Sequence, residues 1–430
     1  MTTEISVASA LDASEAAAAE AGDSPTDTAV MGCGMLRIGV FFDGTGNSRD
    51  HADLVGSPGI DVESWHTNVD LLERIYKKSD STEDITVAGQ QRKIRYFSHY
   101  LRGIGVAIDG STTTFGMSMG RGEEGVAARV EQAMNELRLL IDTNVGDVQP
   151  CDIWFDTFGF SRGSAAARDF SNSILDAELT YGSARCEVKF LGIYDTVSSV
   201  GNAYPWNRAN PGSWHEMNIR SQREDAINPS TTRPIAEKIV HITAKDEVRY
   251  DFPLALAHRE TRIQVVGAHS DIGGGYHPGG DTSTFTYEWS DFPGVLDFYL
   301  DRWIGVGGEN AFETEAVAWN ALGERRIGTV TLTTRVQHGL QFVTLRLMHD
   351  NAVSAGVPFK PLPAVIDGYD VSMNSELMDY YLALSAGNVP DEMERSIRGK
   401  YAHFSANNRS NWGFHPNLPM PNAVRVVEVH

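Results

Sequence analysis

The hydrophobic pattern of the chain consists of short, nearly continuous apolar runs separated by longer amphipathic or polar stretches. Runs of this length and texture are typical of strands buried inside a sheet. Polar, Gly-rich loops follow several of them. The predicted strands are Met35–Phe42, Arg92–Tyr100, Ile153–Phe158, Val188–Tyr194, Lys238–Thr243 and Arg262–Val266. One position breaks the pattern, because Asp156 places a carboxylate inside an otherwise apolar run.

Apolar residues at helical spacing lie between these runs. They predict helices over Ser64–Lys77 and Gly125–Ile141, and the latter helix is expected to pack on the sheet with no other role. Strands that alternate with helices indicate an α/β fold, with a mostly parallel central sheet and helices on both faces. The C-terminal part is expected to be mostly helical, with helices over Phe292–Trp303, Thr334–Ala355 and Asn374–Ala386.

Composition divides the chain unevenly. Met1–Thr28 is rich in Ala, Glu, Asp, Ser and Thr and lacks the basic and apolar regions of a signal peptide, so a disordered acidic leader is expected over residues 1–30. Residues 31–430 are expected to form a single domain, with helical additions at about 281–400. A stretch of low periodicity at about 204–236 is interpreted as a lid-like insertion, in which Trp206 and Trp214 could face lipid.

The segment Asp152–Asn172 carries the candidate chemistry. Gly159, Ser161 and Gly163 follow a predicted strand and precede an Ala-rich helix, which is the setting of a nucleophile elbow. A serine in such a turn has strained backbone angles, and residues without bulk on either side let strand and helix approach closely. Ser161 is therefore the candidate nucleophile. The alternative is an ordinary Gly-rich turn between a strand and a helix.

Two further segments supply candidate partners for the serine. Asp195 ends a predicted strand, and His269 lies on a Gly-rich loop after a later strand. The chain order Ser, Asp, His is that of a hydrolase triad on a parallel sheet. Asp195 could instead cap a turn, and His269 could cap a turn or bind a metal. His403, on a loop late in the chain, is the second candidate for the base.

The loop after the first strand reads Asp43-Gly44-Thr45-Gly46-Asn47. Loops at the carboxyl ends of parallel strands carry chemistry. Amides of Gly44 and Thr45, with the amide of Arg162 after the serine, are the expected oxyanion hole. Asp-Gly-Thr after a strand also occurs in phosphatases of the haloacid dehalogenase type, but Phe41 stands where their nucleophilic aspartate belongs.

Charge and cysteine content narrow the range of functions. The 430 residues carry a formal net charge of −21, and no clustered basic surface is evident, so nucleic acid is not an expected partner. Cys33, Cys151 and Cys186 show no paired spacing, so neither a disulfide framework nor a zinc site is expected, and synthesis in a reducing cytoplasm is inferred. No stretch reaches the length of a membrane span, which limits membrane action to the surface.

Five segments together resemble one family. VFFDGTGN, FGFSRGSAAAR, LGIYDTV, GAHSDIGGGY and YAHFSA are similar to the bacterial α/β-hydrolase family of type VI secretion lipase effectors, first class. The resemblance runs from about Leu36 to the end and implies an α/β-hydrolase fold. It also implies a phospholipase whose triad consists of Ser161, Asp195 and His269, the residues that the sequence pattern selects. The long membrane-anchoring module of some family members is absent from this sequence.

The resemblance gives further expectations. The expected reaction is cleavage of carboxylic esters of membrane phospholipids through an acyl-enzyme. The protein is expected to reach a target cell without a signal peptide and to act in its periplasm. The expected protein partners are a secretion-apparatus carrier and an immunity protein. No cofactor is required for this chemistry, and calcium at phosphate headgroups stays undecided. A generic carboxylesterase and a non-catalytic hydrolase-like binding module remain as alternatives.

Overall fold

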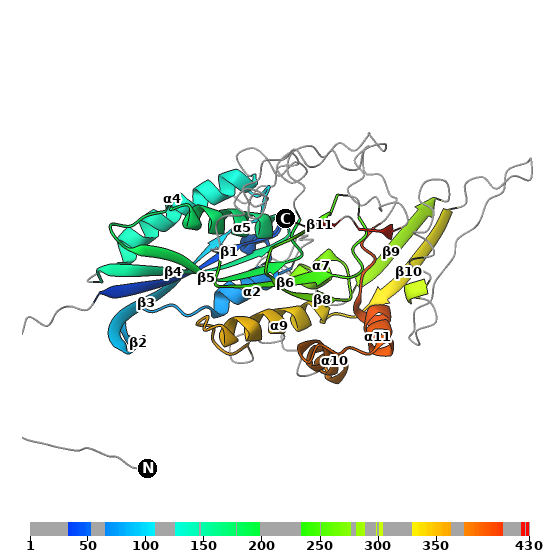
Figure 1. Ribbon diagram of the computed structural model, residues 1–430. Helices are drawn as coiled ribbons and strands as arrows, with labels where there is room; N and C mark the ends of the chain where they lie inside the picture. The colour runs from blue at the N-terminus through cyan, green and yellow to red at the C-terminus, as the bar shows by residue number, and fades with distance from the viewer. Residues whose placement is uncertain are drawn as a thin grey trace, which may run out of the picture. The chain divides into compact units, whose positions relative to one another are not determined.

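In the computed structural model, the described part of Cys33–His430 forms a unit built around a central β-sheet (Figure 1). The described residues are 33–52, 65–107, 125–145, 148–177, 179–197, 234–249, 251–276, 281–288, 298, 301–303, 329–362, 374–406, 423–425 and 427–429. The predicted leader and most of the predicted lid, including Trp206 and Trp214, lie outside them. Both therefore stay predictions.

A seven-stranded sheet forms the centre of the unit, in the order β2-β3-β1-β4-β5-β6-β8. All neighbouring strands are parallel except β2 and β3, which form an antiparallel pair at one edge. The fold is thus α/β with a mostly parallel sheet, as predicted. The strands are β1 (Gly34–Phe42), β2 (Glu83–Val87), β3 (Gln90–Leu101), β4 (Pro150–Phe160), β5 (Arg185–Tyr194), β6 (Lys238–Ala244) and β8 (Thr261–Val265).

Helices cover both faces of this sheet (Figure 1). On one face, α4 (Val126–Asn144) and α5 (Arg162–Leu175) bury residues such as Leu137 and Phe170 in one apolar cluster. On the other face, α2 (Asn68–Ile75), α9 (Leu340–Ser354) and α10 (Ser375–Ser385) contribute to a second cluster. The short helices α1 (Arg49–Ala52) and α7 (His269–Gly273) and the helix α11 (Asp391–Tyr401) complete the described helices. The central strands β1, β4, β5 and β6 are buried over most of their length, which explains why their sequences are nearly continuous apolar runs.

The connections that leave β1 and β4 run to opposite faces of the sheet. The chain passes from β1 to α2 on one face, whereas it passes from β4 directly into α5 on the other. The two strands are neighbours, and Phe42 near the end of β1 pairs with Gly159 near the end of β4. Such a switch in direction leaves a crevice at the carboxyl ends of the two strands, where ligands bind in open α/β sheets. Ser161 lies at this point.

The carboxylate inside β4 is paired across the sheet. Asp156 is fully buried and accepts two hydrogen bonds from Arg37 on β1, at 2.8 and 3.0 Å, and one from the Tyr76 hydroxyl at 2.8 Å. Burial raises the pKa of Asp156 despite the opposing charge of Arg37. A buried carboxylate is tolerated when its oxygens are bonded in this way. Strand β4 continues through Asp156, although its pairing with β5 shifts in register between Phe155 and Asp156.

The C-terminal prediction needs correction. Residues 281–400 are not only helical additions, because β9 (Asp281–Glu288) and β10 (Thr329–Val336) form an antiparallel ribbon. The helix expected from Thr334 begins at Leu340, after Gly339, whose φ of 123° is unsuited to helix. The β-branched sequence TVTLTTRV favours a strand before that glycine. The parallel pair β7 (Leu254–Leu256) and β11 (Val427–Val429) was also missed.

The cysteine prediction is wrong. Cys33 and Cys151 form a disulfide, with their Cα atoms 5.6 Å apart. Although 118 positions separate them in sequence, they flank the paired residues Gly34 and Pro150 at the start of β1 and β4. Only strand pairing brings them together, so sequence spacing gave no signal.

Candidate active site

The turn around Ser161 has the strained geometry expected of a nucleophile elbow. Ser161 has φ 60° and ψ −128°, values that side-chain-bearing residues rarely adopt, between the end of β4 and the start of α5. A Cβ on Gly159 would lie 2.5 Å from the Gly163 carbonyl oxygen, and one on Gly163 would lie 2.2 Å from the Asp43 carbonyl oxygen. Both glycines are therefore required by close backbone approach.

Backbone hydrogen bonds fix the serine beside the end of β5. The Ser161 amide donates to the Tyr194 carbonyl at 3.0 Å, and the Val197 amide donates to the Ser161 carbonyl at 3.3 Å. Asp195 lies between those two partners in the chain. The sheet register thus places the elbow and the Asp195 backbone side by side.

Asp195 is fully buried and its carboxylate has several donors. Its Oδ2 lies 2.5 Å from His269 Nδ1, and its Oδ1 accepts from the Ala244 amide at 2.9 Å. The Arg425 guanidinium donates to both oxygens, at 2.7 and 2.9 Å. Burial alone would raise the pKa of Asp195, but the charge of Arg425 and the bond to His269 outweigh it and hold that pKa well below its ordinary value. Asp195 is therefore an ionised carboxylate.

His269 opens the short helix α7, and its ring lies against the elbow. The Phe160 ring, one residue before Ser161, has its centroid 4.6 Å from that of His269, and the Phe252 ring lies 4.9 Å away on an edge-to-face contact. Nε2 of His269 is buried and has no hydrogen-bond partner within the described part of the chain. Burial lowers the pKa of His269, against the raising effect of Asp195. A neutral imidazole bonded through Nδ1 presents Nε2 as an acceptor, which is the requirement for a general base.

The loop after β1 contacts the elbow on its other side. Arg162 Nη1 donates to Thr45 Oγ1 at 3.3 Å, and the Asp43 backbone packs on Gly163. The Gly44 amide, however, donates to Asp43 Oδ1 at 2.7 Å. Of the three amides predicted for an oxyanion hole, that of Gly44 is thus engaged within its own loop.

The Asp43 side chain connects this loop to Thr67 and Tyr100. Its carboxylate is buried and also accepts from Thr67 Oγ1 at 2.6 Å and from the Tyr100 hydroxyl at 2.5 Å. Burial raises the pKa of Asp43 to about 6, although these hydrogen bonds act in the opposite direction. The Asp43 carboxylate therefore holds the loop in place. Phe41, which stands where phosphatases of the haloacid dehalogenase type have their nucleophilic aspartate, is part of the apolar core.

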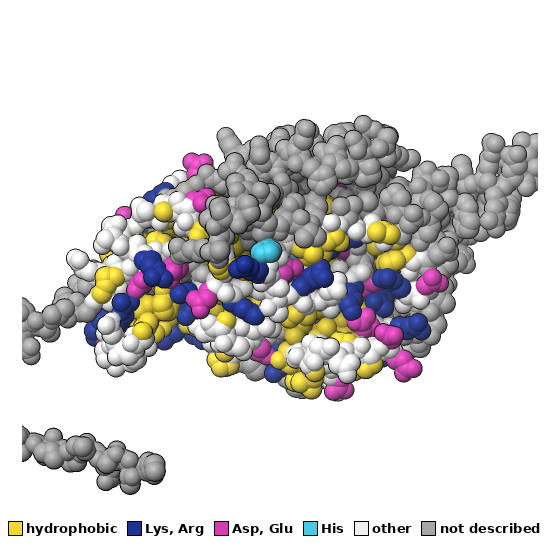
Figure 2. Space-filling view, in the orientation of Figure 1, with side chains coloured by type: hydrophobic (Ala, Val, Ile, Leu, Met, Phe, Trp, Pro, Cys, Tyr) yellow, Lys and Arg dark blue, Asp and Glu magenta, His cyan; other side chains and the backbone are white. Residues whose placement is uncertain are grey.

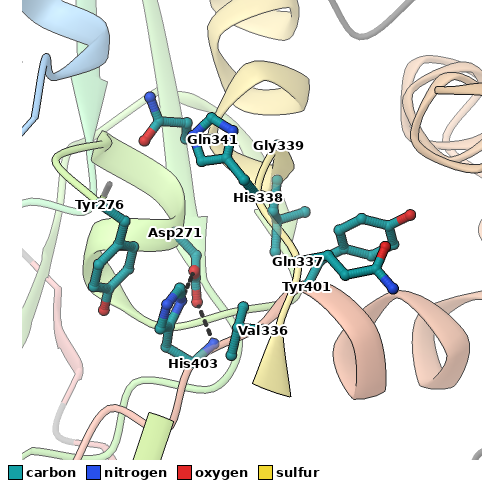
Figure 3. A pocket seen from close by; sticks show the side chains of 10 residues that line it. Asp271, Tyr276, Val336, Gln337, His338, Gly339, Gln341, Tyr401 and His403 are labelled. Carbon is teal, nitrogen blue, oxygen red and sulfur yellow. Dashed lines mark hydrogen bonds and ion pairs between the residues drawn. The ribbon is translucent and has the colours of Figure 1, made fainter. Parts of the chain in front are cut away.

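The structure gives His403 a different partner. Its Nδ1 lies 2.7 Å from Asp271 Oδ1, and its ring stacks on Tyr276 at a centroid separation of 3.7 Å. Figure 3 shows His403 and Tyr276 lining a small pocket, to which β10 and the start of α9 also contribute. Ser161, Asp195 and His269 are not among its lining residues. The described contacts therefore join His269, and not His403, to Asp195.

Sequence reasoning missed Arg425, because an arginine more than 200 positions from Asp195 shows no motif. It also missed Glu247, which accepts from the His269 amide at 3.2 Å. A search of the described residues finds no group of three or more His, Cys, Asp or Glu side chains that could hold a metal ion. None of the described helices is long and apolar enough to cross a membrane.

Basic side chains do not gather into one cluster on the face seen in Figure 2. They alternate there with acidic and hydrophobic side chains.

The chain is similar to known proteins in two comparisons. The family model described as "T6SS, Phospholipase effector Tle1-like, catalytic domain" matches residues 172–290, a stretch that contains Asp195 and His269 but not Ser161. A solved structure described as "Structure of the Tle1 effector bound to the VgrG spike from the Type 6 secretion system" aligns with a TM-score of 0.61 at 22% identity, over 93% of this chain and 94% of that chain. These findings confirm the resemblance to type VI secretion lipase effectors, and the second shows a shared fold.

A further solved structure, an uncharacterized protein from Pseudomonas aeruginosa, aligns at 18% identity and a TM-score of 0.45, over 85% of this chain and 53% of that chain. A sequence search of curated proteins finds no match.

Proposed function

We propose that the protein is a serine hydrolase of the α/β-hydrolase type that cleaves carboxylic esters of membrane phospholipids, as a phospholipase A. The observation that carries this proposal is the His269–Asp195 pair beside a strained serine turn. Nδ1 of His269 is bonded to an ionised carboxylate at 2.5 Å, and the ring packs on Phe160 next to Ser161. The family match to phospholipase effectors supports the choice of a lipid ester.

The proposed reaction begins at Ser161. His269 Nε2 takes the proton from Ser161 Oγ as the oxygen attacks the ester carbonyl carbon, and Asp195 stabilises the imidazolium. The tetrahedral intermediate collapses as His269 gives this proton to the leaving alcohol oxygen, which leaves an acyl-enzyme. Water, deprotonated by His269, then attacks the acyl carbon. The bond between this carbon and Ser161 Oγ breaks as His269 returns the proton to Oγ, and the fatty acid leaves. No cofactor is required for any of these steps.

The oxyanion is proposed to bind to backbone amides at the start of α5. The amide of Arg162 lies at the helix N-terminus, where amides have no partner within the helix and the dipole favours negative charge. A second donor comes from the loop after β1. Thr45 suits this role better than Gly44, because the Gly44 amide already donates to Asp43.

The comparisons support a proposal for the delivery and the partners of this protein. The Tle1 effector of the similar structure is bound to a VgrG spike, and we extend a secretion-apparatus carrier of this kind to the present chain. The target compartment is proposed to be the periplasm of another cell, and an immunity protein would protect the producer. The membrane surface is the proposed site of action, with the residues around Trp206 and Trp214 as the expected contact.

The test is hydrolysis of phospholipid vesicles by the purified protein, with product analysis. We expect free fatty acid and lysophospholipid from the wild type and neither from Ser161→Ala. A generic carboxylesterase would instead hydrolyse soluble esters with no gain when substrate is presented as vesicles. Calcium dependence is decided in the same assay by adding a chelator.

A second test separates enzyme from binding module in cells. Wild type and Ser161→Ala are expressed in a bacterium with and without a periplasmic export signal. Toxicity is expected chiefly from exported wild type. Equal toxicity of the exported serine variant would favour a non-catalytic binding module.

A further inference from the structure

Arg425 makes a two-pronged contact with Asp195. Nη1 donates to Oδ1 at 2.7 Å and Nη2 to Oδ2 at 2.9 Å, while Nε donates to the Phe252 carbonyl at 2.7 Å. The Arg425 side chain is 8% exposed and that of Asp195 is 0% exposed. Bidentate, charge-assisted bonds of this kind are strong and directional.

The backbone holds Arg425 in this position. Two residues later β11 begins, and its Val427 pairs with Leu254 of β7. Phe252, whose carbonyl accepts from Arg425, lies just before β7 and contacts the His269 ring. Arg425 and His269 also share one oxygen, Asp195 Oδ2. A displacement of the arginine would therefore move the carboxylate on which His269 depends.

We infer that Arg425 is a positioning residue for the proposed reaction. It holds the Asp195 carboxylate in place against His269 and partly neutralises the negative charge of that carboxylate. The inference rests on the proposed function of Ser161, Asp195 and His269. It assigns a role in the chemistry to the segment before the C-terminal strand, which no motif in the sequence indicated.

The charge of Arg425 has a direct consequence for His269. Asp195 raises the proton affinity of the imidazole, and a cation bonded to the same carboxylate reduces that effect. Other charged groups near His269 are Glu247, which accepts from its amide, and Arg249. On the elbow side, Arg162 interacts electrostatically with Asp251. Loss of the Arg425 charge should therefore raise the pKa of His269, while these other groups stay in place.

A matched pair elsewhere in the sheet serves as a control. Arg37 on β1 also makes two bonds to a fully buried aspartate, Asp156, and its side chain is 11% exposed. Asp156 contacts Tyr76 and none of the proposed triad in the described structure. Arg37→Gln removes the same charge and the same type of bond as Arg425→Gln. Any effect common to both variants is structural.

The experiment measures kcat/KM against pH for p-nitrophenyl butyrate, together with the melting temperature, in wild type, Arg425→Gln, Arg425→Lys and Arg37→Gln. For Arg425→Gln we expect the acidic limb of the profile to move up by about one pH unit. Arg425→Lys keeps the charge and should leave the limb in place, with kcat lowered about 10-fold and KM unchanged because the two-pronged geometry is lost. Arg37→Gln should lower the melting temperature and leave the limb unmoved.

An Arg425→Gln profile with an unmoved limb, like that of Arg37→Gln, would overturn the inference. If Arg425→Gln does not fold, the lysine variant decides, since wild-type kcat in Arg425→Lys would also overturn it. Ser161→Ala is measured in parallel. Activity retained there contradicts the proposed function itself, whereas an inactive Ser161→Ala with an unmoved limb in Arg425→Gln contradicts only the role of Arg425.

Discussion

Two histidine–aspartate pairs share the helix α7. His269, its first residue, is bonded to Asp195 at 2.5 Å, and Asp271, two residues later, is bonded to His403 at 2.7 Å. In both pairs the histidine uses Nδ1, and in both Nε2 is buried without a hydrogen-bond partner among the described residues. By pair geometry alone, either could orient a general base.

The surroundings of the two carboxylates differ. Asp195 receives the Arg425 guanidinium, whereas Asp271 Oδ2 accepts two backbone amides, those of Ala268 at 2.7 Å and His403 at 2.9 Å. Asp271 thus connects the chain next to Ala402 with the start of α7. Asp195 is instead held by Arg425, which lies just before β11, and is bonded to the histidine beside the elbow. The role of a histidine–aspartate pair thus depends on what lies next to Nε2 of the histidine and on which groups bind the carboxylate.

The largest difference between the two pairs is expected in kcat when each histidine is replaced by alanine. We expect Ser161→Ala and His269→Ala each to lower kcat by roughly 10⁴- to 10⁶-fold, with the double variant little worse, because triad members act as a unit. His403→Ala should lower kcat only a few-fold through a loosened α7. Ester hydrolysis by the purified variants checks this. Full activity in His269→Ala with loss in His403→Ala would reverse the assignment.

The carboxylates give the next largest contrast. Asp195→Asn should lower kcat by about 10⁴-fold, since an amide can hold His269 in the wrong tautomer. Asp271→Asn should lower the stability of the fold, because it removes a carboxylate that accepts hydrogen bonds from two backbone amides. We expect the free energy of unfolding to fall by about 1–3 kcal/mol. Urea denaturation and ester hydrolysis on both variants measure the two effects. An equal loss of activity in both would remove the distinction.

The pH dependence of kcat/KM tests the protonation state of His269. Burial lowers the pKa of His269, so the neutral base persists below the ordinary imidazole value. The rate should fall as pH decreases through that pKa, with the acidic limb of kcat/KM below about pH 6.5. Asp195 stays ionised throughout this range, because its pKa is held well below the ordinary value. A limb above pH 7 would contradict a desolvated, neutral His269.

The smallest effect is expected from the leader, which contributes no residue to either pair. Its composition cannot bury enough apolar surface to fold, so a protein that begins near Val30 should keep its turnover and its unfolding midpoint. Calorimetry and ester hydrolysis on the truncated chain test this. A lowered midpoint would show that residues 1–28 pack on the domain.

The sequence alone determined the elements whose causes are local. Continuous apolar runs specified the strands β1, β4, β5 and β6, and the spacing of Gly159, Ser161 and Gly163 specified the strained turn, since only close backbone approach demands that pattern. Short strands such as β7 and β11 escaped prediction, because three residues carry no periodicity.

Only the tertiary structure determined the contacts between residues that are far apart in the sequence. It selected His269 over His403 as the partner of Asp195, because the register of β5, β6 and β8 aligns their carboxyl ends while Asp271 holds His403 elsewhere. It also joined Cys33 to Cys151 and brought Arg425 to Asp195. Contacts across 118 and 230 positions arise from strand order and pairing, and no local pattern of residue types encodes them.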